Sequence, residues 1–108
     1  MNSWIILILA GICEIVWALG LKFSEGLTKP MQSAITIAFM VLSLYLLAVA
    51  SRHIPIGISY SVWVGIGAFG TLVGSMLLFG DKINFIQLMF CITLVISVLG
   101  IKLSAIDM

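Results

Sequence analysis

The sequence predicts an all-α membrane protein with four transmembrane helices. Of its 108 residues, 63% are hydrophobic and only 8% are charged, whereas ordinary soluble domains carry about 25% charged residues. Four apolar stretches follow one another, each long enough to cross the roughly 30 Å hydrocarbon layer of a bilayer. They cover residues 3–21, 31–50, 58–79 and 85–103. The connections are short, so we expect residues 1–108 to form a single four-helix transmembrane domain.

This organisation excludes several classes of function. Nearly every residue belongs to an apolar stretch or a short connection, which leaves no soluble part for a catalytic or docking domain. The basic residues are scattered and the net charge is +1, so we expect no nucleic-acid partner. Cys13 and Cys91 lie inside apolar runs, where cysteine acts as a small hydrophobe. We therefore expect no metal, no cofactor and no enzymatic activity, and function must arise between the helices.

One carboxylate interrupts the first apolar stretch. Between Trp4 and Leu21 the only charged residue is Glu14, near the middle of the span. An ionised side chain at that depth costs at least ~2.5 kcal/mol on insertion scales, and such residues mark ion or substrate paths. We expect Glu14 to face a water-filled cavity and to bind protons and cations in turn. The alternative is a protonated carboxyl that only hydrogen-bonds a neighbouring helix.

Two further residues share the expected depth of Glu14. Trp17 follows it by one helical turn on the same face, where an indole can donate its N–H to a carboxylate and present its π-face to a cation. The alternative for Trp17 is the interfacial anchoring that suits Trp4. Ser43 lies near the middle of the second stretch, and spacing alone allows either a site role or a bond to its own backbone.

The third stretch combines polar aromatics with glycines. Tyr60, Trp63 and Gly67 recur at helical spacing and share one face. Gly65 and Gly67 flank a single residue, an arrangement that allows either close helix packing or a bend.

The fourth stretch holds no ionisable residue before Lys102. Ser97 and Gly100 give it a strip of small residues, which is typical of helix association in membranes. We therefore expect this helix to form a dimer contact.

The loop charges are nearly balanced between the two sides of the membrane, so they do not fix the orientation of the chain. Arg52 and Lys102 lie on the side of the N-terminus, and Lys22, Lys29 and Lys82 lie on the other. Because the positive-inside rule acts on this difference, a bias of one charge permits insertion in both orientations and antiparallel pairing. A single orientation remains the alternative.

The order of these features resembles the small multidrug resistance transporters over essentially the whole chain. The likeness rests on the lone glutamate of the first helix, KFSEG at 22–26, IPIGISYSVWVGIG at 54–67 and the lysine near the end of the fourth helix. GICEIVWALGLK at 11–22 looks like the guanidinium-exporter subtype, which has Trp three residues after the Glu. The chain departs from that subtype at Val64, where a hydroxyl residue is usual. It departs from the family at Phe90 and Ser97, where a small-residue dimer motif is usual.

The resemblance implies an antiparallel, dual-topology dimer in the bacterial inner membrane that exchanges protons for one guanidinium-like cation by alternating access. It further implies that Glu14 is the shared proton and substrate ligand, that Trp17 and Ser43 hydrogen-bond it, that Tyr60 is a switch on the gate side, and that Trp63 lines the pocket. The partner is a second copy or a paralogous family member.

Two other functions remain open from the residues. Export of quaternary ammonium and other lipophilic cations is one alternative. It is favoured by the departure at Val64, and the resemblance allows it because some relatives of the guanidinium-exporter subtype also export quaternary ammonium compounds. An accessory subunit of a larger membrane complex, with Glu14 paired to a partner's cation, is an alternative of another class. An intramembrane enzyme is disfavoured, because the chain's only histidine, His53, lies in a loop.

Overall fold

The computed structural model describes residues 2–104 as four α-helices joined by short connections. The helices are α1 (Ser3–Phe23), α2 (Pro30–Ala50), α3 (Ile56–Phe79) and α4 (Phe85–Ser104). Each observed bound lies within two residues of the corresponding apolar stretch. All four are long and apolar enough to cross a membrane, so the prediction of an all-α membrane protein with four transmembrane helices is confirmed.

Local chemistry accounts for where the helices begin and end. Asn2 caps α1, because its side-chain oxygen accepts a hydrogen bond from the Trp4 backbone N–H at 2.8 Å. Pro30 occupies the first turn of α2, where its missing N–H costs nothing. α3 ends at Gly80, whose φ of +67° is a left-handed conformation that glycine adopts without strain.

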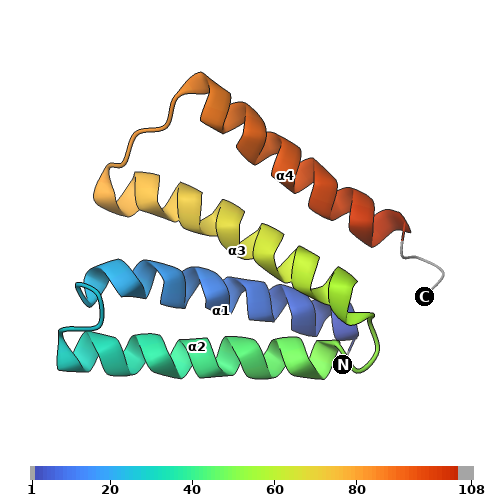
Figure 1. Ribbon diagram of the computed structural model, residues 1–108, viewed down its shortest axis with the longest axis horizontal. Coiled ribbons are helices and arrows are strands. Elements are labelled where there is room, and N and C mark those ends of the chain that lie inside the picture. Colours follow the sequence, from blue (N-terminus) through green and yellow to red (C-terminus); the bar gives the residue numbers. More distant parts are fainter. Residues whose placement is uncertain (1, 105–108) are drawn as a thin grey trace.

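The helices lie side by side in the order α2, α1, α3, α4 (Figure 1). The molecule measures 44 × 34 × 18 Å, which is a slab and not a closed bundle. Only α3 approaches α4 closely within residues 2–104, and Cys91 is the only buried residue of α4. Such an arrangement is stable in a bilayer because lipid tails solvate apolar side chains as well as another helix does.

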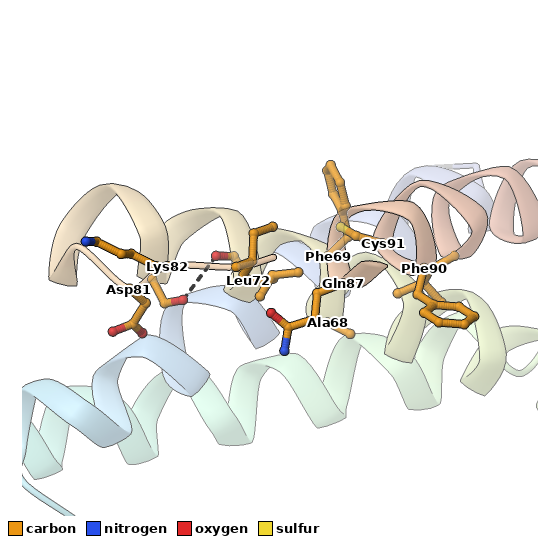
Figure 2. Close-up of a pocket in the computed structure, with 11 residues that line it drawn as sticks. Ala68, Phe69, Leu72, Asp81, Lys82, Gln87, Phe90 and Cys91 are labelled. Carbon is orange, nitrogen blue, oxygen red and sulfur yellow. Dashed lines mark hydrogen bonds between the residues drawn. The ribbon is translucent and has the colours of Figure 1, made fainter. Parts of the chain in front are cut away.

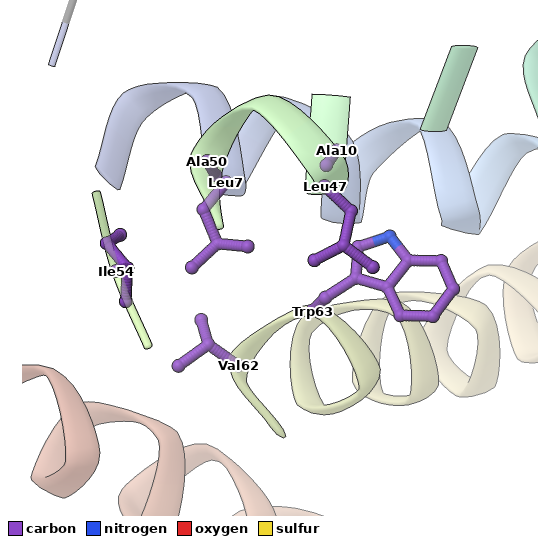
Figure 3. Close-up of a cluster of buried hydrophobic side chains, with 7 residues drawn as sticks. All are labelled: Leu7, Ala10, Leu47, Ala50, Ile54, Val62 and Trp63. Carbon is purple, nitrogen blue, oxygen red and sulfur yellow. The ribbon is translucent and has the colours of Figure 1, made fainter. Parts of the chain in front are cut away.

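A core of seven buried residues joins α1, α2 and α3 on the N-terminal side of Glu14 (Figure 3). Leu7 and Ala10 come from α1, and Val62 and Trp63 come from α3. The remaining members are Leu47, Ala50 and Ile54. This core fixes the three helices at one end of the molecule and so sets how α1 presents Glu14 to α3.

Candidate functional site

Glu14 lies at the contact between α1 and α3, directly against Gly67. A Cβ atom added at Gly67 would lie 2.7 Å from Glu14 Cγ and closer still to the carboxyl group. The glutamate side chain is half-buried as a result. Glycine at position 67 therefore makes room for a carboxylate that a larger residue would displace.

The same helix contact is lined by further glycines. On α3, Gly70 meets the Ile15 side chain and Gly74 meets Leu19, where an added Cβ would lie 2.7 Å from Leu19 Cδ1. Gly65 turns the other way and meets Val98 of α4. Since α3 is one unbroken helix from Ile56 to Phe79, these four glycines allow close packing and do not break the helix.

A groove of about 410 Å³ opens beside Glu14. In the described residues, four buried side-chain polar atoms have no hydrogen-bond partner: Glu14 Oε1, Trp17 Nε1, Thr71 Oγ1 and Ser33 Oγ. The first three belong to residues that line this groove. Because buried polar groups are nearly always paired, this concentration of a carboxylate, an indole N–H and a hydroxyl indicates a place for a polar ligand.

The groove continues along α3 toward the connection between α3 and α4. Ala68, Leu72 and Ser75 line both the groove and a second pocket of about 690 Å³. This pocket also includes Asp81 and Gln87, as Figure 2 shows. The groove at Glu14 and this second pocket therefore adjoin along α3.

Ser43 takes part in a hydrogen-bond chain that differs from both sequence-based expectations. Its hydroxyl donates to the Ala10 carbonyl at 2.7 Å and accepts from the indole N–H of Trp63 at 2.9 Å. Ser43 thus bonds neither Glu14, as the resemblance implied, nor its own helix. Ala10 is the residue four before Glu14, so its carbonyl belongs to the helical turn that carries the carboxylate. Through this contact Ser43 and Trp63 hold the turn that positions Glu14.

The aromatic residues divide between the groove and the core. Trp17 lines the groove, but its indole N–H has no partner instead of donating to Glu14. Trp63 is buried in the core and lies outside the lining of the groove that a single chain forms. Tyr60 is more than half exposed, with its ring 5.7 Å from that of Trp63. Trp63 is buried because its ring packs beside Leu47 of α2 (Figure 3).

The small residues of α4 face outward. Ser97 and Gly100 are exposed, and a Cβ added at Gly100 would meet nothing within 4 Å. Within a single chain, no other helix covers Ser97 and Gly100 among the described residues.

Thr71 lines the groove but is absent from the sequence-based set of site residues. It follows Gly67 by one helical turn and Val64 by two, so all three lie on one face of α3. Helical spacing counted from Gly67 could have found it.

The model of the Small Multidrug Resistance protein family matches residues 2–102. The chain belongs to the small multidrug resistance family. It is 43% identical over 102 residues to a "Guanidinium exporter" of Escherichia coli O6:H1, covering 94% of this chain and 97% of the relative. It is 42% identical over 103 residues to a protein of the same name from Proteus vulgaris, covering 95% and 99%.

Membership agrees with the four membrane-spanning helices. A chain of this family, with relatives of this kind, is a multi-pass protein of the bacterial inner membrane and a transporter.

Proposed function

We propose that the protein is a proton-coupled antiporter that exports guanidinium or small guanidinyl cations by alternating access. The observation that carries the proposal is the carboxyl of Glu14, half-buried in a membrane helix and facing a groove with two further unpaired polar atoms. The name "Guanidinium exporter" of relatives that match nearly the whole chain supports guanidinium as the substrate.

The groups of the groove suit a flat cation that is rich in N–H donors. A carboxylate can accept two parallel N–H bonds from a guanidinium ion. The Trp17 indole, which lines the same groove, can present its π-face to the cation. Glu14 would supply the charge and Trp17 one wall of the site, while Ser43 and Trp63 position the turn that carries Glu14.

Coupling would follow from competition for one carboxylate. A proton or a cation neutralises Glu14, and either loaded form can pass between the two membrane faces. The empty, ionised form is disfavoured because an unpaired charge in hydrocarbon is costly. Since protons and cation exclude one another at Glu14, movement of one in one direction drives the other in the opposite direction.

A second copy in the opposite orientation would complete the site. The groove is open along one side of the slab, and the strip of Ser97 and Gly100 on α4 is exposed and available for helix contact. The nearly balanced loop charges permit both orientations. We propose an antiparallel homodimer, or pairing with a paralogous family member, that places two Glu14 carboxylates in one cavity. Tyr60, exposed beside Trp63, would act at the gate.

Proton flux in proteoliposomes tests the proposal. An outward gradient of guanidinium or methylguanidinium should drive protons inward, and Glu14→Gln should abolish the flux because Gln keeps the shape but cannot titrate. Glu25→Gln is the matched control, since Glu25 is exposed in the α1–α2 connection, away from the groove, and its carboxylate pairs with Lys29 at 3.4 Å. Coupled flux that persists in Glu14→Gln would refute the role of Glu14.

The choice of gradient also decides between substrate classes. Val64 lines the groove and adds apolar surface beside Glu14, a feature that favours some binding of quaternary ammonium ions. Flux driven by tetraalkylammonium ions and not by guanidinium would replace guanidinium export by multidrug export. A protein that binds no cation and moves no protons would instead be an accessory subunit.

A further inference from the structure

We propose that the hydroxyl of Thr71 is a direct ligand of the transported cation, accepting an N–H bond on the side of the ion away from Glu14, and that it favours guanidinium-type ions over cations without N–H groups. This inference rests on the proposed function, because it names the second acceptor of the same site. It concerns a residue on α3, one helical turn beyond the point where Glu14 meets that helix.

Thr71 lacks the hydrogen bond to its own helix that several other hydroxyl residues of the membrane helices make. A serine or threonine inside a helix usually donates to the carbonyl four residues before it. Thr36, Ser61 and Thr93 do so, at 2.8, 2.8 and 2.9 Å. The corresponding acceptor for Thr71 would be the Gly67 carbonyl, yet Thr71 Oγ1 is buried without a partner in the described residues. Its hydroxyl is therefore available to a ligand.

The position of Thr71 fits a second acceptor. Glu14 reaches α3 at Gly67, and four residues of helix advance about 6 Å along the axis. A flat ion held by N–H···O bonds of about 2.9 Å on two edges needs acceptors separated by a distance of this order. Both residues line the same groove, so one small planar cation can contact the carboxylate and the hydroxyl together.

The side chain can also turn toward the ligand. Threonine in a helix divides between two χ1 rotamers, and a change of rotamer can bring its hydroxyl to the surface of the groove that the residue already lines. Val64, on the same face two turns earlier, offers no hydrogen bond. Ser75 of α3 also lines the groove, but its hydroxyl already donates to the Leu72 carbonyl at 3.0 Å. Thr71 is thus the unpaired hydroxyl that α3 contributes to this groove.

The test is the selectivity of cation binding by purified, reconstituted protein. Thr71→Val keeps the side-chain shape and removes the hydroxyl, and a hydrogen bond to a charged ligand is worth about tenfold or more in affinity. We expect the dissociation constant for guanidinium to rise about tenfold. The affinity for tetraethylammonium, which has no N–H group, should stay unchanged. Thr71→Ser should restore guanidinium binding, and Thr71→Ala should reproduce the loss.

Two controls separate a ligand role from a structural one. Thr36→Val makes the same change at a buried hydroxyl that already has a partner on its own helix, and it should leave the ratio of the two affinities unchanged. An equal fall in both affinities for Thr71→Val, or no fall for guanidinium, would overturn the inference. Retained guanidinium binding by Glu14→Gln would overturn the proposed function, whereas failure of the Thr71 variants alone would overturn only the role of Thr71.

Discussion

Substitution of Gly67 by alanine tests the placement of Glu14 most directly. The added Cβ would lie 2.7 Å from Glu14 Cγ, well inside the 3.4 Å at which ordinary contact begins, and closer still to the carboxyl. Overpacking of this kind costs about 1–3 kcal/mol, while alanine regains about 1 kcal/mol as the better helix former. The Glu14 carboxyl must therefore move away from position 67, at a net cost of up to about 2 kcal/mol, or about 30-fold in an equilibrium constant.

We expect Gly67→Ala to weaken guanidinium binding by up to about 30-fold and to slow cation-driven proton flux, measured in detergent and in proteoliposomes respectively. Gly57→Ala is the matched control, because a Cβ at Gly57 would meet nothing within 4 Å. Gly70→Ala meets the end of the Ile15 side chain instead, so it should lower stability more than affinity. If Gly67→Ala binds guanidinium as tightly as Gly57→Ala does, the position assigned to Glu14 is wrong.

Three other predictions follow from the site and the topology. Trp17→Gly should shift preference toward larger cations by vacating volume beside Glu14, as competition binding would show. Ser43→Ala should lower the free energy of unfolding by about 1–3 kcal/mol, because it leaves the buried indole N–H of Trp63 unpaired; unchanged chemical denaturation would contradict the hydrogen-bond chain. An extra lysine beside Asp81 should bias orientation one way and impair transport, and a single fixed orientation of the unmodified chain in reporter fusions would rule out antiparallel self-pairing.

Sequence reasoning located the helices well because bilayer thickness dictates the length of each apolar run. The same reasoning found Glu14, since one charge in a long apolar segment stands out whatever its neighbours are. Hydropathy does not distinguish α4 from the other helices, however. Its peripheral position against α3 alone depends on which surfaces fit, and this information is not present in the pattern of one helix.

The partners of polar side chains were harder to predict. Ser43 lies at the depth of Glu14, but its hydroxyl bonds Ala10 and Trp63 because the approach of α2 to α1 sets its direction. Thr71 was overlooked because a single hydroxyl within a glycine-rich run has no distinguishing spacing until one neighbour is known to meet Glu14. Helical periodicity gives the face of a residue, whereas its hydrogen-bond partner depends on the adjacent helix.

The position of α4 at the edge of the slab has a thermodynamic consequence for assembly. Its apolar side chains are already well solvated by lipid, so association through α4 would gain little from the hydrophobic effect and would depend on the fit of small residues. The equilibrium between one chain and two would then follow the mole fraction of protein in the bilayer, and the volume of surrounding water would not enter it. Diluting the protein with lipid would separate the chains, whereas adding buffer at constant lipid would leave them paired.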